Sequence, residues 1–364
     1  MTCFKPIIAW QYKQMPINAN KDEETLKKYR KIYFHKLKDG QQIEIPCGRC
    51  IGCRLDHANM WATRIVEETK KWKHAIFVTL TYAEHKLRQD GTPTLPRTKE
   101  GYPTLSKRDV QLFLKRLRKQ EKGIEAWENP KTHKIEYPIR YFYCGEYGQK
   151  NTKRSHYHMI IWNWTPNDLK YYKNSDGSNE ALYTSKKLEK LWGLGFCPIG
   201  NVTYESACYV ARYVQKKAGI PAKKREYEDY TDENGNMKSK IKKEIGPIPE
   251  FICMSRGVGI GRTAWDTDKE KFKRNNGIPT KTKETITTKP IPRYFKKLWE
   301  KENMAEFDTW RYKMKKIALQ TKEKLLKCYN FGQMQWNADT TVNNQKMTEL
   351  EIKSKKLKRP LDNS

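Results

Sequence analysis

The chain has 364 residues, which is enough for one large domain or two modest ones, each with a real hydrophobic core. Hydrophobic residues make up 37% of it and aromatic residues 12%, a composition that excludes an intrinsically disordered protein. The formal net charge is +31, since 73 lysine and arginine residues face 42 acidic ones. Such a surplus favours a polyanionic partner, with a merely basic soluble enzyme as the plainer alternative.

Membrane insertion and export are both disfavoured. The sequence contains no run of 18 apolar residues that could span a bilayer. The first six residues lack the apolar core of a signal peptide, so we expect a cytoplasmic protein. In that compartment the nine cysteines are expected to be thiols or metal ligands rather than disulfides.

Three cysteines, Cys47, Cys50 and Cys53, lie within seven residues. Closely spaced thiolates in a reducing compartment are typical of a structural zinc site. Such a site needs a fourth ligand, for which Cys3 is the first candidate and His57 the second. An iron–sulfur cluster and unliganded cysteines are the alternatives. Zinc here would tie the N-terminus to the helix that follows.

Hydrophobic periodicity predicts the elements of the first half. A further helix begins at Ser106, where Asp109 three residues later completes a capping pattern. Its basic face is either an ordinary solvated face or a surface that tracks phosphates. In chain order we expect a charged helical stretch over 22–33, a helix over 56–73, a strand over 74–82, a loop over 90–104, and this helix with Val110, Phe113, Leu114 and Leu117 on its apolar face.

The second half begins with a predicted hairpin and becomes more polar toward its end. The region beyond residue 217 is expected to contact DNA or to be partly disordered. In order we expect strands over 140–147 and 156–162 around a turn, a polar loop over 174–179, helices over 182–192 and 204–217 joined by a short connection at 193–203, a polar stretch over 221–237 with a turn at Asn234 and Gly235, a basic stretch over 269–301, a helix over 308–328 and a basic tail.

His156 and His158 are the strongest candidates for metal ligands. Residues i and i+2 of a strand project from the same face, so the two imidazoles form half of a divalent-metal site. Glu146, across the predicted hairpin, would complete a face of two histidines and one carboxylate. The plainer alternative is two partly exposed histidines and a surface glutamate, because the register of a hairpin is not readable from sequence.

Tyr209 and Tyr213 are one turn apart on the predicted helix over 204–217 and share a face. Lys216 and Lys217 follow close to that face. In isolation, aromatic core residues would explain the two tyrosines equally well.

Several motifs together resemble those of the HUH endonucleases. These are the strand at 77–82, the His-Tyr-His of residues 156–158 and the two-tyrosine helix, in that order. More narrowly, the chain resembles the replication initiators of microviruses of the gokushovirus type. That likeness includes the cysteine cluster, the Gly-Glu-Tyr-Gly at 145–148 and the glycine-rich segment at 255–261, and it covers most of residues 1–300.

The resemblance implies an α+β fold with a central antiparallel sheet and flanking helices. It also implies Mg²⁺ or Mn²⁺ at His156 and His158, with Glu146 as a candidate third ligand. We expect an N-terminal segment over residues 1–60 with the zinc site, a nuclease core over 61–218, and a basic extension over 219–364 that is partly helical with a disordered tail.

The expected activity is the nicking of one strand of viral replicative-form DNA at the origin. A tyrosine forms a 5′-phosphotyrosyl link, and the displaced strand is later rejoined. Lys216 or Lys217 would stabilise the phenolate. Expected partners are single-stranded and origin DNA and the helicase and polymerase of a bacterial host, in whose cytoplasm the protein would act. No small-molecule cofactor is expected, since the sequence lacks a phosphate-binding loop.

Other functions remain in competition. A non-catalytic, zinc-stabilised nucleic-acid-binding protein would explain the charge and the cysteines but not the histidine and tyrosine pairs. A plasmid relaxase or a transposase would share the chemistry, although relaxases usually place their tyrosines before the histidines. An RNA-processing nuclease is a more distant alternative.

Overall fold

The computed structural model describes residues 3, 6–12, 31–48, 50–148, 154–175, 180–212, 224–231, 237–281, 286–329 and 348. The chain forms two compact units. One comprises Met1–His57 and Trp310–Leu357, and the other Ala58–Thr309 and Lys358–Ser364. Seven helices lie in the described ranges, and none of them is long and apolar enough to cross a membrane.

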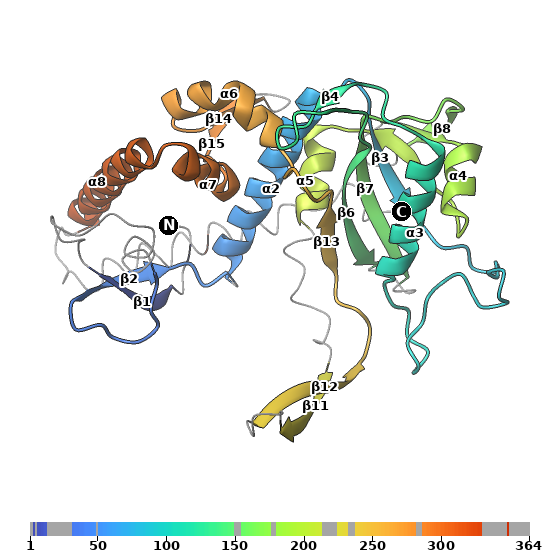
Figure 1. Ribbon diagram of the computed structural model, residues 1–364, viewed down its shortest axis with the longest axis horizontal. Coiled ribbons are helices and arrows are strands. Elements are labelled where there is room, and N and C mark those ends of the chain that lie inside the picture. Colours follow the sequence, from blue (N-terminus) through green and yellow to red (C-terminus); the bar gives the residue numbers. More distant parts are fainter. Residues whose placement is uncertain are drawn as a thin grey trace. The chain divides into compact units, whose positions relative to one another are not determined.

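A seven-stranded antiparallel sheet forms the centre of the larger unit (Figure 1). The sheet with its flanking helices confirms the predicted α+β class. The strand order is β13 (Phe251–Met254), β6 (Arg140–Tyr147), β7 (Ser155–Trp162), β3 (Ala75–Leu80), β10 (Ile199–Asn201), β9 (Ala181–Thr184) and β8 (Lys170–Asn174).

Helices α3 (Lys107–Gln120) and α4 (Lys186–Trp192) cover one face of the sheet. The predicted cap of α3 is confirmed, because the Ser106 side chain accepts a hydrogen bond from the Asp109 amide. All four residues of its predicted apolar face are buried. They pack with alternate residues of β3, namely Ile76, Val78 and Leu80.

Helices α2 (Ile51–Lys71) and α5 (Tyr204–Arg212) contribute to a second apolar cluster on the other face. Ile65 of α2 and Val210 of α5 are fully buried there against side chains such as Ile160 of β7. This helix layer covers only part of the face. The open remainder carries the candidate site.

A buried tyrosine network anchors β7 to the start of α3. The Tyr157 hydroxyl lies 2.6 Å from the Ser106 amide nitrogen and 3.0 Å from the Ser106 carbonyl oxygen. It also lies 3.1 Å from the hydroxyl of Tyr82, which donates to Asp109. Because Tyr157 stands between His156 and His158 in sequence, this anchor on the helix-covered face turns both histidines to the opposite face.

The region between β7 and α5 differs from the sequence prediction. The predicted helix over 182–192 is wrong in its first part, where β9 pairs with β8 and β10 and the helix begins only after Ser185. The predicted connection over 193–203 contains β10. Each of these strands is five residues or shorter and is stabilised by its neighbours, so local propensity gives little signal.

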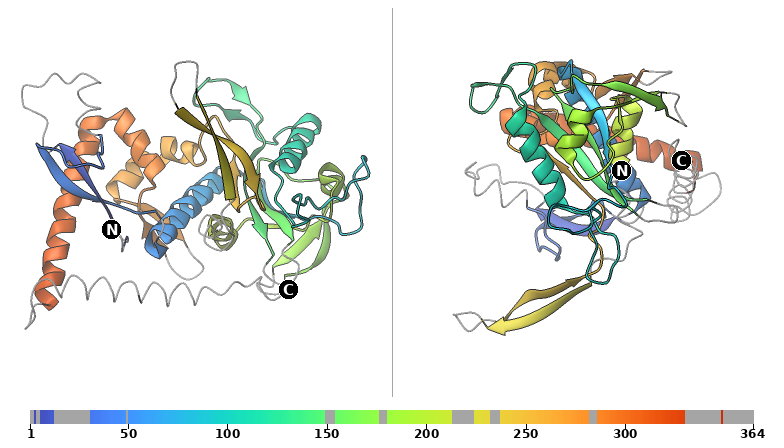
Figure 2. Two further views of the ribbon diagram at one scale, coloured as in Figure 1. Left: turned by 90° about the horizontal axis from the view of Figure 1, so that it is seen from below. Right: turned by 90° about the vertical axis from the view of Figure 1, so that its right-hand side faces the viewer.

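The polar stretch after residue 221 contains two further strands that the sequence analysis missed. β11 (Lys224–Thr231) and β12 (Met237–Ile245) form an antiparallel ribbon (Figure 2). The predicted turn at Asn234 and Gly235, the helix over 22–33 and the end of the tail lie outside the described residues.

Residues 262–309 fold around their own aromatic cluster. The elements are α6 (Arg262–Arg274), β14 (Ile278–Lys281), β15 (Ile286–Lys289), α7 (Arg293–Glu302) and the start of α8 (Met304–Tyr329). Five buried aromatic rings fill the interior, those of Trp265, Phe272, Phe295, Trp299 and Phe307.

The glycine-rich segment before α6 forms a turn, one of the two roles considered for it. Gly257 and Gly261 have φ angles of +94° and +80°, which glycine adopts without strain. The Gly261 amide donates to buried Glu68 on α2, whose carboxylate also pairs with Arg140 of β6 at 2.5 Å.

The smaller unit contains a two-stranded antiparallel sheet of β1 (Ile7–Tyr12) and β2 (Gly40–Ile45). It also contains the first turns of α2 and the later part of α8. The predicted helix over 56–73 therefore begins earlier than expected, immediately after Cys50.

Candidate active site

The register of β6 against β7 brings the three predicted metal ligands together. Glu146 lies directly opposite His156 in the antiparallel ladder. One Glu146 oxygen, Oε2, lies 3.3 Å from Nε2 of His156 and 3.3 Å from Nε2 of His158. One ligand atom from each residue lies within 4.8 Å of the other two, as one metal ion requires. We call these three residues the Glu-His-His cluster.

The second nitrogen of each imidazole is held by a neighbouring group. Nδ1 of His156 donates to the Arg154 carbonyl oxygen at 3.2 Å. Nδ1 of His158 lies 3.0 Å from the Thr79 hydroxyl on β3. These contacts orient both rings with Nε2 toward the carboxylate, and such second partners are typical of metal-binding histidines.

The carboxylate of the cluster is ionised although it is buried. Only 2% of Glu146 is exposed. Burial raises its pKa, but the hydrogen bonds and charges of His156 and His158 more than offset this and hold the pKa at about 2. A carboxylate and two imidazoles suit a divalent cation such as Mg²⁺ or Mn²⁺.

Helix α5 brings Tyr209 to the same cluster. Its hydroxyl lies 3.2 Å from Nε2 of His158, and the two rings meet edge to face at 4.9 Å. Phe77 of β3 stacks on the other side of His158 and also contacts Tyr209. Burial of the adjacent Val210 holds the helix at this position. A phenol is therefore within reach of any phosphate bound at the cluster.

The remaining predicted site residues cannot be placed. Tyr213, Lys216 and Lys217 lie outside the described residues, because the described part of α5 ends at Arg212. Their roles remain predictions.

Glu250 is a neighbouring acidic residue that the sequence analysis missed. It precedes β13 and accepts a hydrogen bond from the Tyr147 amide at 3.2 Å. Burial and the charge of Glu146 raise its pKa to about 7, despite the lowering effects of the Tyr147 amide and His156. The only local signal was the short apolar run at 251–254, and nothing in it indicates pairing with a strand a hundred residues earlier.

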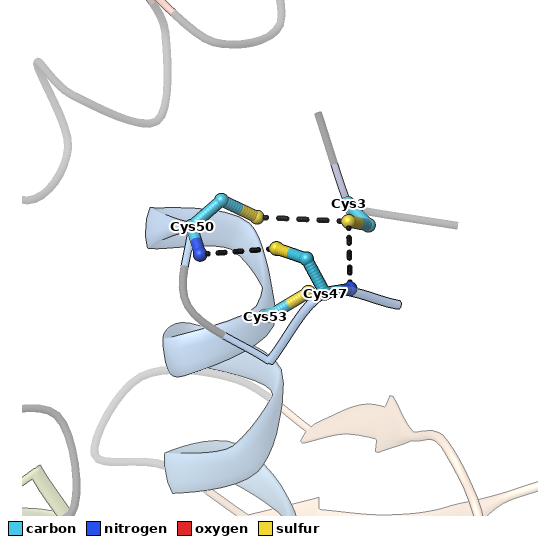
Figure 3. Close-up of side chains that lie close together, drawn as sticks. All are labelled: Cys3, Cys47, Cys50 and Cys53. Carbon is cyan, nitrogen blue, oxygen red and sulfur yellow. Dashed lines mark hydrogen bonds between the residues drawn. The ribbon is translucent and has the colours of Figure 1, made fainter. Parts of the chain in front are cut away.

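The cysteine cluster forms a compact group in the smaller unit (Figure 3). One sulfur atom from each of Cys3, Cys47, Cys50 and Cys53 lies within 4.8 Å of the others, so the structure brings Cys3 rather than His57 into the group. The sulfurs of Cys3 and Cys50 are 3.8 Å apart. A tetrahedral zinc site with Zn–S bonds of about 2.3 Å has sulfur–sulfur edges of roughly 3.8 Å.

Backbone amides already point at these sulfurs. The Cys47 amide donates to the sulfur of Cys3, and the Cys50 amide to that of Cys47, both at 3.3 Å. Burial raises the pKa of the Cys53 thiol to about 12, so binding a metal must displace its proton. The donor set fits a structural Cys₄ metal site.

Comparison with known proteins gives the family. The family model for replication-associated protein ORF2 and its relatives matches residues 75–218, which include the Glu-His-His cluster and both tyrosines of the predicted pair. The chain is 30% identical to replication-associated protein ORF2 of Spiroplasma virus 4 over 313 residues, which cover 81% of this chain and 84% of the relative. The chain belongs to this family of replication-associated proteins.

Two further relatives agree. Replication-associated protein VP4 of Bdellovibrio phage phiMH2K is 32% identical over 288 residues, covering 79% of this chain and 76% of the relative. Replication-associated protein ORF4 of Chlamydia phage 1 is 28% identical over 187 residues, covering 50% and 41%. The resemblance to microvirus initiators is thereby confirmed. No solved structure matches the chain.

Proposed function

We propose that this replication-associated protein is an endonuclease that starts rolling-circle replication of a single-stranded DNA phage by nicking one strand at the origin. The observation that carries the proposal is the 3.2 Å contact between the Tyr209 hydroxyl and His158 within the Glu-His-His cluster. A nucleophile beside a set of metal ligands is the arrangement that phosphodiester transesterification needs.

Glu146, His156 and His158 would hold Mg²⁺ or Mn²⁺, which polarises the scissile phosphate and stabilises the departing 3′-oxygen. The Tyr209 oxygen attacks phosphorus, the bond to the 3′-oxygen breaks, and the products are a 5′-phosphotyrosine and a 3′-hydroxyl. A free phenol has a pKa near 10, so the attacking oxygen must lose its proton first. Lys216 or Lys217 would stabilise the phenolate.

Tyr213 would serve as the second nucleophile. After one round of synthesis it cuts the regenerated origin, and the new 3′-hydroxyl attacks the first phosphotyrosine and closes the displaced strand into a circle. Each step exchanges one phosphoester for another, so no nucleotide is consumed. The free 3′-end would be extended by a polymerase and helicase of the bacterial host, in whose cytoplasm the protein would act.

The cysteine cluster would hold a structural Zn²⁺ through Cys3, Cys47, Cys50 and Cys53. Four sulfurs at tetrahedral spacing, two of them already accepting amide hydrogen bonds, support this assignment. In functional terms we propose that residues 61–218 supply the nuclease chemistry, residues 1–60 the zinc site, and residues 219–364 additional affinity for DNA.

The experiment uses the supercoiled replicative form of the phage that encodes this chain, incubated with the full-length protein and Mn²⁺. We expect nicked circles and a covalent DNA–protein adduct that withstands denaturation. EDTA and His158→Ala should abolish both products. Tyr209→Phe/Tyr213→Phe should form no adduct, whereas Tyr102→Phe, an exposed tyrosine in a distant loop, should react normally.

Two outcomes would contradict the proposal. An adduct that persists in the double tyrosine variant would reject the nucleophile assignment. Tight DNA binding without any nick in the unmodified protein would favour the non-catalytic, zinc-stabilised binding protein instead.

A further inference from the structure

The sheet face that carries the Glu-His-His cluster stays open toward β8. Along β3 the residues that face α3 and α4 are buried, whereas the intervening Phe77 and Thr79 are only partly covered. The same alternation continues at the start of β10, where Cys197 is fully buried and Phe196 is 39% exposed. A partly solvated surface therefore runs from the cluster across β3 and β10.

Phe196 projects from this open face. Backbone bonds from Thr79 to Pro198 and from Thr81 to Phe196 extend the β3–β10 ladder beyond β10. In this register Phe196 lies opposite Thr81, two residues along from Thr79, the partner of His158. The spacing between strands places Phe196 about 10 Å from the β7 backbone.

Tyr172 of the edge strand β8 packs against Phe196. Their ring centroids are 5.3 Å apart with an interplanar angle of 63°, and 50% of Tyr172 is exposed. The β8 register shifts between Tyr171 and Lys173, which leaves Tyr172 as the extra residue of a bulge. A bulge re-aims the side chain it carries. Tyr171 instead contacts Tyr183, which packs against the cluster under α3 and α4.

Basic residues accompany the aromatic pair. Lys170 and Lys173 lie on the same strand, and all five residues of β8 are exposed. Exposed rings between cationic side chains form the surface that binds single-stranded nucleic acid, because unpaired bases stack on the rings while the cations contact phosphates. Paired bases in a duplex cannot stack in this way.

We propose that Tyr172 and Phe196 form a stacking platform for unpaired bases of the DNA strand beside the scissile phosphate, with Lys170 and Lys173 on its backbone. This inference rests on the proposed nicking activity. The strand would run from the Glu-His-His cluster across β3 and β10 to the edge of the sheet at β8.

Binding is measured by fluorescence anisotropy of a labelled single-stranded oligonucleotide in EDTA, so that cleavage does not interfere. Removing a base-stacking ring weakens binding by about 5- to 150-fold. We therefore expect at least about 5-fold weaker binding for Tyr172→Ala/Phe196→Ala. Tyr172→Phe/Phe196→Tyr should retain the affinity, and Tyr171→Ala, the matched control on the opposite face, should change it less than twofold.

Lys170→Ala/Lys173→Ala tests the backbone contacts separately. Each lost phosphate contact lowers the slope of log affinity against log salt by about 0.7 for a single strand, so the pair should lower it by about 1.4. Unchanged melting temperatures would show that none of these exposed substitutions acts through the fold.

The results separate this inference from the proposed activity. Adduct formation by the unmodified protein with undiminished oligonucleotide binding by Tyr172→Ala/Phe196→Ala would overturn the platform and leave the nuclease intact. Weakened binding without any adduct in the unmodified protein would support the platform and reject the nuclease. An equal loss of affinity for a duplex of the same sequence would also overturn base stacking.

Discussion

Thr79 fixes how His158 presents its ring to the Glu-His-His cluster. Its hydroxyl holds Nδ1, which leaves Nε2 directed at Glu146 and at the Tyr209 hydroxyl. The metal-binding geometry therefore depends on a side chain that is itself no ligand. A neighbour of this kind acts through the orientation and basicity of the imidazole.

Thr79→Val removes this contact while preserving shape. Loss of such a partner typically weakens metal binding by about 10- to 100-fold, and we expect Mn²⁺ affinity to fall within that range, as measured by electron paramagnetic resonance titration. Thr81→Val is the matched control, because its hydroxyl bonds instead to the Phe196 carbonyl. Equal Mn²⁺ affinities for the two variants would show that Thr79 does not orient the ring.

Glu250 gives the metal-free protein a pH-dependent stability. Its pKa rises from the ordinary 4.5 to about 7 on folding, so the native state prefers the neutral acid. Its contribution is fully present below pH 4.5 and is lost as the pH rises through 7, on the order of 2–3 kcal/mol in total. Glu146, whose pKa is about 2, has the opposite effect and only at lower pH.

Glu250→Gln should abolish this loss. In EDTA, urea unfolding of the unmodified protein should show a lower free energy at pH 7.5 than at pH 5, and the variant should show a smaller difference. Glu270→Gln, at an exposed residue of α6, should keep the original difference. The same pH slope in Glu250→Gln and the unmodified protein would refute the assignment.

At the scale of the elements, a buried ion pair joins α2, β6 and the turn before α6. Glu68 and Arg140 are 2% and 5% exposed, and Arg140 also donates to the carbonyls of Val258 and Gly259. The Gly261 amide and the Trp72 indole complete the bonding of the Glu68 carboxylate. Every charge is satisfied only when all these segments are in place.

Glu68→Gln would leave a buried guanidinium without its counter-charge. The expected loss of unfolding free energy is about 3–5 kcal/mol, measured by urea denaturation. Glu128→Gln breaks an exposed pair with His133 and should cost less than about 0.5 kcal/mol. A Glu68→Leu/Arg140→Met double variant should lose less than Glu68→Gln, and an equal or greater loss would argue against the ion pair as the cause.

Elements with strong local signals could be predicted from the sequence. The cap at Ser106 and the four apolar residues after it define α3, and the strands around His156 follow from their β-branched and aromatic residues. Short strands such as β10 and β13 could not be predicted, because their stability comes from partners far away in the sequence.

The candidate site shows the same division. That His156 and His158 share a face follows from the two-residue period of a strand. That Glu146 stands opposite His156 depends on the register, and a shift by one residue would turn it to the other face. Glu250 depends on a strand pairing across a hundred residues, for which a single sequence carries no signal.

At the scale of the whole molecule, the two units predict separate responses to metal removal. The Cys₄ group lies entirely in the smaller unit, and the Glu-His-His cluster in the larger one. We expect a strong zinc chelator to raise hydrogen exchange over residues 40–57 while β3 and β7 keep their protection. Loss of protection in both units together would show that they fold as one.

Metal analysis gives an independent check on the same site. Protein purified without chelator should contain one zinc per chain, and Cys50→Ser should bind it far more weakly. Cys253→Ser, at a cysteine in the core sheet, should retain it. Zinc absent from the unmodified protein would reject the site.

The position of β13 also has a consequence for biosynthesis. β13 follows β6 by about a hundred residues, yet the two are adjacent in the sheet. Until Met254 emerges from the ribosome, β6 therefore presents an exposed row of backbone amides and carbonyls, a surface that pairs readily with another chain. Nascent copies on one polysome can exchange strands during this interval. Completion of β13 closes that route, so the pace of translation between the two strands affects how much of the protein reaches its native state.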